Sequence, residues 1–187
     1  MKKYFHTYLC SMELSERIKE TVRDVKDFPK EGIVFKDIST ILLNSDLCKD
    51  IVAHLAEKHR NSNLQGIAGI ESRGFLFGFP LAMALGIPFI LIRKKGKLPY
   101  NKVSYAYNLE YGSAEIEMHS DAINPGDRIL IHDDLLATGG SAAAAAELIR
   151  TCGGNVAGFD FLVELSFLNG ANALTSYNTP ISSLVQY

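Results

Sequence analysis

The chain has 187 residues, of which 47% are hydrophobic, and this is enough to build the core of one ordinary domain. Its formal net charge of -2 argues against nucleic acid or an anionic membrane as the main partner, because both favour a basic surface. The three cysteines are widely spaced and form no C-x-x-C motif, so the sequence predicts neither a disulfide framework nor a zinc site. We expect a protein of the reducing cytoplasm.

The beginning of the chain is expected to be an accessory extension, residues 1–11, followed by a single domain over residues 12–187. The apolar run in the extension is too short for a signal peptide, and no later segment has the roughly 18 uninterrupted apolar residues of a membrane span. From Leu14 to Val25 apolar residues recur at helical spacing, which predicts an amphipathic helix that ends by Pro29.

The remainder of the chain alternates short apolar runs with helical patterns, which is typical of a mostly parallel sheet flanked by helices. The expected strands are Gly66–Ile70, Phe89–Ile92, Arg128–His132 and Val156–Val163. Between the second and third of these, residues 103–119 interleave apolar and polar side chains, which predicts a small antiparallel flap. The predicted fold class is therefore α/β.

The most informative segment, residues 129–141, joins a strand to two carboxylates and a glycine-containing loop. Ile129–Ile131 predicts a strand covered on both faces, and Asp133 and Asp134 come directly after it. Open α/β sheets bind their ligands at this carboxyl end of the strands. The run Ala142–Arg150 consists largely of strong helix formers, so the loop is expected to lie at a helix N-terminus.

The residue types in this segment suit a phosphorylated sugar. Adjacent glycines let the backbone N–H groups close around an anion, and neighbouring hydroxyls add donors. The loop that would hold the phosphate consists of Ala137, Thr138, Gly139, Gly140 and Ser141. An ionised carboxylate only accepts hydrogen bonds, so the two aspartates suit the hydroxyls of a ribose and would repel a phosphate placed directly on them. Ribose 5-phosphate satisfies both requirements.

Three other interpretations of this segment fit less well. No Gly-Lys-Ser/Thr ends the loop, which argues against a Walker site, and the spacing is not the G-x-G-x-x-G of a dinucleotide-binding turn. A plain strand-to-helix turn would need neither adjacent carboxylates nor the combination Thr-Gly-Gly-Ser.

Two further polar segments follow strands and are expected at the same edge of the sheet. Residues 93–99 carry four cations, which could bind a pyrophosphate and stabilise the charge it gains as a leaving group, although such a run is often only a solvated surface. Gly96 and Pro99 would allow this loop to close over a substrate. The segment Glu71–Gly74 could hold the other end of a pyrophosphate, although an ordinary turn would look similar.

Taken together, these motifs resemble the phosphoribosyl diphosphate (PRPP) site of the type I phosphoribosyltransferases. Within that family the resemblance is to the adenine phosphoribosyltransferases, and it runs from about Leu14 to Tyr187. The segments that carry it are 27–29, 32–39, 72–75, 92–99, 109–112 and 163–165, in addition to 129–141. The resemblance implies a type I phosphoribosyltransferase fold with an N-terminal base-binding hood.

The resemblance also implies a reaction and partners. Adenine and PRPP would give AMP and pyrophosphate in purine salvage, with a homodimer as the working form. The cofactor implied is Mg²⁺, which would reach the site through PRPP and water with no direct protein ligand.

Site residues follow from the resemblance position by position. Catalytic residues are Glu110, which would move a proton at the imidazole edge of the base, and Arg93. Pyrophosphate would bind to Ser72, Arg73, Lys94 and Lys97. Adenine would bind to Val34, Phe35, Lys36 and Leu165. The segment 133–141 would hold the ribose and its 5-phosphate.

The chain departs from the family pattern at several positions. Lys36 replaces an arginine, and an ammonium cannot make the planar two-pronged contact of a guanidinium. Ser141 replaces a threonine, His132 replaces an apolar residue, and Glu71 is one methylene longer than the usual aspartate.

Two rival functions keep parts of the pattern. A phosphoribosyltransferase for hypoxanthine, guanine or xanthine would share residues 133–141 but differ around Phe35, Glu110 and Leu165. A regulatory protein that senses PRPP without turnover would be expected to lack Glu110 or the cationic loop, and to carry a nucleic-acid-binding element.

Overall fold

The computed structural model describes residues 13–28, 30–108 and 113–187. The chain divides into two compact units, Met1–His54 and Leu55–Tyr187. The predicted extension over residues 1–11 lies outside the described residues, and the prediction of a single domain from residue 12 onward stays a prediction.

The first unit contains short elements around a few buried isoleucines and leucines. Its elements are α2 (Leu14–Thr21), β1 (Arg23–Lys26), β2 (Val34–Asp37), α3 (Ser39–Leu42) and the first part of α4 (Ser45–His59). Its fully buried apolar side chains include Ile18, Ile38, Ile41, Leu47 and Ile51. A salt bridge of 2.7 Å joins Arg17 of α2 to Asp50 of α4.

The predicted first helix is wrong beyond Thr21, where α2 ends and Val22 adopts an extended conformation. The next residues form β1, which pairs antiparallel with β2. β-branched side chains favour a strand, and cross-strand pairing satisfies the backbone groups that a longer helix would have bonded internally. The connecting turn begins at Asp27, which has a φ of 58° and accepts a hydrogen bond from the Gly32 N–H at 2.7 Å.

The second unit is built on a seven-stranded sheet of order β5-β6-β4-β3-β7-β8-β9. The strands are β3 (Gly66–Ile70), β4 (Phe89–Lys94), β5 (Lys102–Asn108), β6 (Ser113–His119), β7 (Arg128–Leu136), β8 (Asn155–Glu164) and β9 (Ile181–Gln186). Pairing is parallel from β4 through β3, β7 and β8 to β9, whereas β5 and β6 are antiparallel. The predicted parallel sheet with an antiparallel flap is confirmed.

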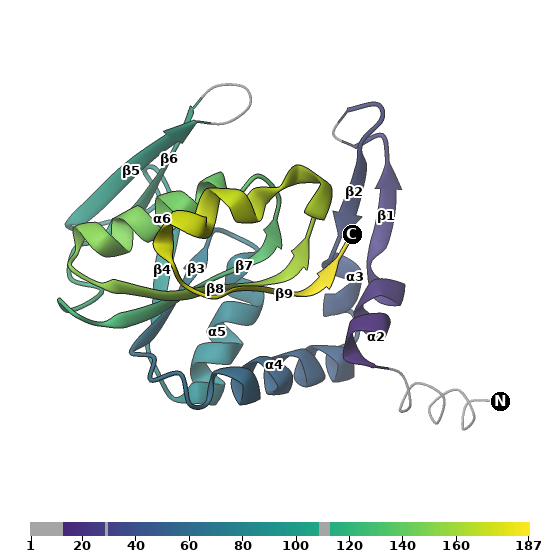
Figure 1. The fold of residues 1–187 in the computed structure, drawn as a ribbon, viewed down its shortest axis with the longest axis horizontal. Coiled ribbons are helices and arrows are strands. Elements are labelled where there is room, and N and C mark those ends of the chain that lie inside the picture. Colours follow the sequence, from purple (N-terminus) through teal and green to yellow (C-terminus); the bar gives the residue numbers. More distant parts are fainter. Residues whose placement is uncertain (1–12, 29, 109–112) are drawn as a thin grey trace. The chain divides into compact units, whose positions relative to one another are not determined.

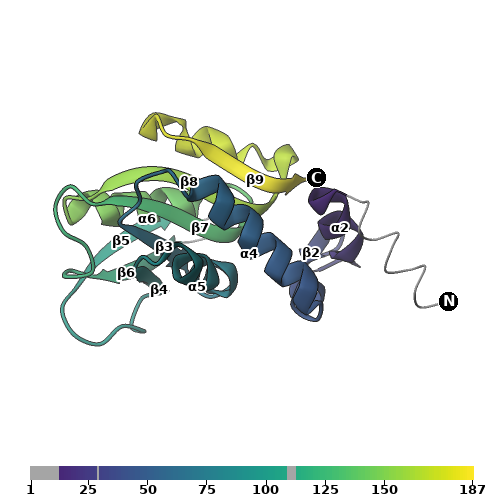
Figure 2. The ribbon, with the colours of Figure 1, turned by 90° about the horizontal axis from the view of Figure 1, so that it is seen from below.

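Two helices of this unit, α5 (Gly74–Leu85) and α6 (Gly140–Thr151), cover opposite faces of the sheet (Figures 1 and 2). Alternation along β7 shows the same division, because Ile131 joins the core that includes the alanines of α6, whereas His132 lies against Gly78 of α5. α5 ends at Leu85, and its C-cap residue Gly86 has a φ of 67°, which glycine adopts without strain.

All four predicted strands are present, and three of them extend beyond the predicted ends. The sequence did not predict β9, which completes the sheet, or the 3-10 helices η1 (Ser166–Leu168) and η2 (Gly170–Tyr177). Among the described residues, no helix is both long enough and apolar enough to cross a membrane.

Candidate active site

The two aspartates lie where β7 extends past its neighbour. The pairing of β3 with β7 stops at His132, whereas β7 continues beside β8 as far as Leu136. The chain turns after β3, and this turn brings Nε of Arg73 to 3.0 Å from Oδ2 of Asp134. The backbone N–H of Asp134 donates to Oδ1 of Asp133 at 2.9 Å. The structure therefore brings together three of the predicted site residues.

The carboxylate of Asp134 is buried but incompletely satisfied. Only 4% of this residue is exposed, and Oδ2 accepts no hydrogen bond of good geometry from the described residues. The ion pair with Arg73 offsets part of the cost of burying this charge, and hydrogen-bond donors on a ligand would offset more of it. A hydroxyl-bearing ligand, such as a ribose, would supply such donors.

Both carboxylates hold a proton more readily than an exposed aspartate. Burial raises the pKa of Asp133 well above its usual range, and the negative charge of Asp134 raises this pKa further. Burial also raises the pKa of Asp134, although the charge of Arg73 opposes that effect. Carboxylates with such raised pKa values are typical of binding and catalytic sites rather than of structural turns.

The glycine-containing loop is a compact turn onto the N-terminus of α6. Gly139 has a φ of 82°, a left-handed conformation that a residue with a side chain adopts only with strain. A Cβ at this position would lie 2.4 Å from the carbonyl oxygen of Gly170 in η2. The N–H groups that start a helix have no partner within the helix, so the loop has the chemistry of an anion site.

Replacing Gly139 with alanine is expected to raise the KM for PRPP by about tenfold and to lower the thermal unfolding midpoint, because the loop must shift away from η2. The matched control is Gly126→Ala, since Gly126 also has a positive φ of 91° but a Cβ there would meet nothing within 4 Å. Steady-state kinetics and thermal unfolding of both variants check this. Equal behaviour of the two would show that the contact with η2 does not shape the loop.

Acidic residues pair with some of the cations of residues 93–99, which we call the cationic loop. Arg93 donates to both carboxylate oxygens of Glu71, at 3.2 and 3.1 Å, and the backbone N–H of Lys94 also donates to Glu71. These hydrogen bonds hold the pKa of Glu71 below its usual value despite partial burial. Lys95 pairs with Glu115 at 2.7 Å. The side chains of Lys94 and Lys97 remain the cations of this loop without a described hydrogen bond or ion pair, which fits their predicted role.

A buried glutamate on the flap fixes the backbone of the same loop. Glu117 is 2% exposed and accepts hydrogen bonds from the N–H of Gly96 at 3.0 Å and from Nζ of Lys102 at 2.9 Å. Burial alone would raise the pKa of Glu117, but these donors hold it below its usual value. Sequence reasoning missed this residue and Glu115. The available signal was the alternation of two carboxylates along a flap strand beside a cationic loop.

The turn after β3 brings the start of α5 close to β7. Ser72 precedes Arg73, which occupies the N-cap position of α5, and the Glu71–Ser72 peptide bond is cis. A Cβ on Gly74 would lie 2.8 Å from Oδ1 of Asp133, so glycine permits this close approach. The predicted pyrophosphate residues of this turn therefore lie beside the carboxylate pair.

His132 lies beneath this edge of the sheet and is fully buried. Burial lowers the pKa of His132 to about 4, because it outweighs the opposing effect of Asp160. The neighbouring His59 and Lys58 lower this pKa further. Asp160 is itself buried and paired with His59 and with Lys58, which lies 3.1 Å away. Burial would raise the pKa of Asp160, but these two partners hold it below its usual value. The departure at His132 therefore places a neutral imidazole in the core.

His132 should make stability depend on pH. A histidine with a depressed pKa stabilises the fold above its unfolded pKa of 6.5, and this stabilisation is lost as the pH falls towards the folded value of about 4. The expected loss between pH 7 and pH 4 is about 3 kcal/mol. Denaturant unfolding of the wild type and of His132→Leu across this range tests it, because the titration of the aspartates is common to both proteins. Parallel stability curves would contradict the assignment.

The predicted adenine-binding residues belong to different units, Val34, Phe35 and Lys36 to the first and Leu165 to the second. Val34, Phe35 and Lys36 lie on β2, where the Phe35 ring packs edge-to-face on Phe28 with centroids 5.2 Å apart. Nζ of Lys36 lies 2.6 Å from Asp24 of β1. In the second unit, the N–H of Leu165 donates to the carbonyl of Leu136 at the end of β7. The predicted catalytic residue Glu110 lies outside the described residues.

The sequence and fold were compared with known proteins. The family model of the phosphoribosyl transferase domain matches residues 39–168. An adenine phosphoribosyltransferase of Cytophaga hutchinsonii is 51% identical over 174 residues, covering 93% of this chain and 96% of the relative. The crystal structure of adenine phosphoribosyltransferase from Thermoanaerobacter pseudethanolicus has a TM-score of 0.88 and 44% identity, covering 92% of this chain and 99% of that one.

A further solved structure contains ligands. The adenine phosphoribosyltransferase of Saccharomyces cerevisiae, complexed with an imino-altritol bisphosphate and adenine, has a TM-score of 0.85 and 40% identity, and the match covers 91% of this chain and 98% of that one. The range matched by the family model holds the carboxylate pair, the glycine-containing loop and the cationic loop, and each relative matches more than nine-tenths of the chain. The chain therefore belongs to the adenine phosphoribosyltransferase family.

Proposed function

We propose that the edge of the sheet at Asp133 and Asp134 carries out this family's reaction. The chain transfers the 5-phosphoribosyl group from PRPP to adenine, giving AMP and pyrophosphate in purine salvage. The observation that carries the assignment to this edge is the carboxylate pair, with Asp134 buried and ion-paired to Arg73, directly before a glycine-containing loop on a helix N-terminus.

The residues at this edge act mainly by binding and orienting PRPP. Asp133 and Asp134 accept hydrogen bonds from the ribose hydroxyls, and the N–H groups and hydroxyls of residues 137–141 hold the 5-phosphate. Holding the sugar at both ends fixes the anomeric carbon for attack by N9 of adenine, so that part of the barrier is removed by orientation. The new C–N bond forms as the C–O bond to pyrophosphate breaks.

The leaving pyrophosphate is held by cations on two turns. Ser72 and Arg73 lie beside the carboxylate pair, and Lys94 and Lys97 extend from the cationic loop. Arg93 contributes to charge stabilisation while Glu71 fixes its guanidinium. Preorganised cations that meet the developing charge are the largest expected contribution to the rate.

The base is recognised by the N-terminal hairpin together with Leu165, and Glu110 handles its proton. Val34, Phe35 and Lys36 supply an apolar cover and main-chain groups for adenine. In AMP synthesis the carboxylate of Glu110 receives the proton that the imidazole edge loses, and it returns this proton in the reverse reaction.

Mg²⁺ is the proposed cofactor and would neutralise part of the pyrophosphate charge. It prefers oxygen ligands and is commonly bound by one or two carboxylates together with substrate phosphates. The adjacent carboxylates of Asp133 and Asp134 are oxygen donors of this kind. Among the described residues, no group of three or more histidine, cysteine, aspartate or glutamate side chains is placed to hold a metal ion.

We further propose that the chain works as a homodimer in the cytoplasm. The described Cys48 and Cys152 are both free thiols, which suits a reducing compartment. The dimer proposal rests on α5, which exposes the large apolar side chains of Leu76, Phe79 and Met83 along one face. Exposed apolar residues clustered on one face are typical of a protein interface.

Replacing Met83, which is 67% exposed, with glutamate is expected to convert the dimer to a monomer, because a pair of charges would be buried across a two-fold interface. Light scattering after size-exclusion chromatography measures the mass. The control is Leu43→Glu, since Leu43 of the first unit is 89% exposed and lies outside α5. A dimer that survives Met83→Glu would place the interface elsewhere.

The experiment that tests the proposed function is product analysis with PRPP, magnesium and each of adenine, hypoxanthine, guanine and xanthine. We expect AMP and pyrophosphate from adenine and no nucleotide from the other bases. A different nucleotide would retain the chemistry but overturn the base assignment. PRPP binding without turnover of any base would support the sensor function instead.

A further inference from the structure

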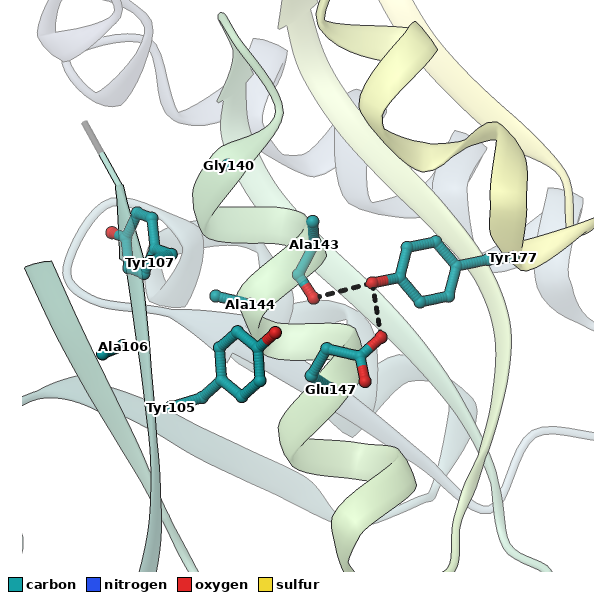
Figure 3. Close-up of a pocket in the computed structure, with 8 residues that line it drawn as sticks. All are labelled: Tyr105, Ala106, Tyr107, Gly140, Ala143, Ala144, Glu147 and Tyr177. Atoms are coloured by element: carbon teal, nitrogen blue, oxygen red, sulfur yellow. Dashed lines mark hydrogen bonds between the residues drawn. The ribbon is translucent and has the colours of Figure 1, made fainter. Parts of the chain in front are cut away.

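A pocket of about 350 Å³ lies between the flap strand β5 and one face of α6 (Figure 3). This volume is at the lower end of the range for small-molecule sites. Its lining residues are Tyr105, Ala106, Tyr107, Gly140, Ala143, Ala144, Glu147 and Tyr177. Apart from Gly140, none of them has a role in the proposed reaction. We call this cavity the tyrosine pocket.

The walls and floor of the tyrosine pocket suit a flat ring. Tyr105 and Tyr107 are two residues apart on β5, so their side chains leave the same face of the strand. The floor is one face of α6, where Gly140, Ala143 and Ala144 precede Glu147 at helical spacing. The floor residues are small, and Figure 3 shows Tyr105 and Tyr107 on the β5 side of the pocket and Ala143 and Ala144 on the α6 side.

The Glu147 carboxylate in the tyrosine pocket is held in place through one oxygen, while its other oxygen accepts no hydrogen bond from the described residues. The hydroxyl of Tyr177 lies 2.8 Å from Oε1 of Glu147 and 3.0 Å from the carbonyl oxygen of Ala143. Arg150 lies over the Tyr177 ring, 4.4 Å from its centroid, and NH1 of Arg150 reaches the same Oε1 at 3.4 Å. Oε2 of Glu147 has no hydrogen-bond partner among the described residues. The carboxylate is therefore oriented by its neighbours and presents a free acceptor.

We propose that the tyrosine pocket is a second ligand site, which binds a planar heteroaromatic ring that carries an amino group, such as an aminopurine nucleoside. Stacking on aromatic side chains supplies affinity for any nucleobase-like ring. A carboxylate accepts hydrogen bonds and cannot donate them, so Glu147 selects a ring with N–H donors and disfavours phosphate. The catalytic base site and the tyrosine pocket therefore accept related rings through different residues.

Occupation of the tyrosine pocket should affect turnover. Burial raises the pKa of Tyr107, and the charge of Asp133 raises it further, so the two residues lie within electrostatic range of each other. β5 leads directly to the segment that contains Glu110. A ligand packed on β5 would restrain this strand and so change the rate. This consequence rests on the proposed function, whereas binding in the pocket does not.

The test uses adenosine as the probe, titrated calorimetrically into the protein saturated with PRPP and magnesium. N9 of adenosine already carries a ribose, so adenosine cannot attack PRPP, and that ribose would clash with PRPP at the catalytic base site. We expect one adenosine per chain to bind in addition to PRPP. Glu147→Gln and Tyr105→Ala should each weaken this binding by about tenfold, whereas Tyr105→Phe, which keeps the ring, should bind as the wild type does.

The matched control is Glu57→Gln, because Glu57 of α4 pairs with Arg60 three residues later, directly after the end of that helix, as Glu147 pairs with Arg150 on α6. This variant should bind adenosine normally. The proposal is overturned if no adenosine binds in the presence of PRPP, or if both pocket variants bind it as the wild type does. If PRPP itself does not bind, the proposed function fails. Titration of the same variants with adenosine alone then tests whether adenosine binds in the tyrosine pocket.

Discussion

Replacing Glu110 with leucine is expected to lower kcat by about a hundredfold or more while leaving PRPP binding nearly intact. General acid–base catalysis commonly contributes about 10²–10⁴ to a rate, and leucine can neither receive nor return the proton of the base. In the proposed site PRPP is held by residues of β7, the turn before α5, the start of α6 and the cationic loop, so its dissociation constant should change little.

Steady-state kinetics in both directions and a PRPP titration measure these two effects separately. The control is Glu115→Gln, a change on the same hairpin at a carboxylate that pairs with Lys95. It should retain most of the turnover. Turnover that is unchanged in Glu110→Leu would remove the residue from the mechanism, and a parallel loss of PRPP binding would give it a structural role.

Replacing Asp133 with asparagine is expected to lower kcat/KM for PRPP by about a hundredfold, or about 3 kcal/mol, while raising the thermal unfolding midpoint. Activity falls because a carboxylate acceptor for the ribose becomes an amide. Stability rises because the folded pKa of Asp133 is raised, and such a carboxylate stabilises the fold only at low pH. At neutral pH its buried charge opposes folding, and a neutral amide removes that cost.

Opposite signs for activity and stability distinguish a ligand-binding carboxylate from a structural one. Kinetics with varied PRPP and thermal unfolding at pH 7 provide the two values. Loss of both activity and stability would mean that Asp133 stabilises the turn and has no direct role in binding substrate. The same measurements at pH 5 should show a smaller difference in midpoint, since Asp133 then carries a proton more often.

The sequence was sufficient for the central sheet because its strands are continuous apolar runs. Gly66–Ile70 is buried at every position, and its periodicity cannot be confused with that of an exposed helix. The segment from Leu14 onward shows the limit of the same method. Its apolar spacing fits a helix as far as Thr21, but pairing with β2 decides the structure of residues 23–26, and that pairing depends on residues farther along the chain.

The candidate site could be predicted where the residues that form it are neighbours in the sequence. The carboxylates and the glycine-containing loop lie on one segment, whereas the partners of the cationic loop come from two other places, the turn after β3 and strand β6. Glu71, Glu115 and Glu117 determine which cations are neutralised, and their contacts with the loop depend on strand register. The packing of Gly139 on Gly170 likewise joins segments that no local pattern connects.

The most direct test of the central claim is a crystal structure of the chain with PRPP and magnesium in the absence of a base. We predict that the 5-phosphate lies on the N–H groups of residues 137–141, the ribose hydroxyls lie against Asp133 and Asp134, and the pyrophosphate contacts Arg73 with Lys94 or Lys97. A 5-phosphate on the cationic loop, or a ribose without contact to the carboxylate pair, would contradict the account.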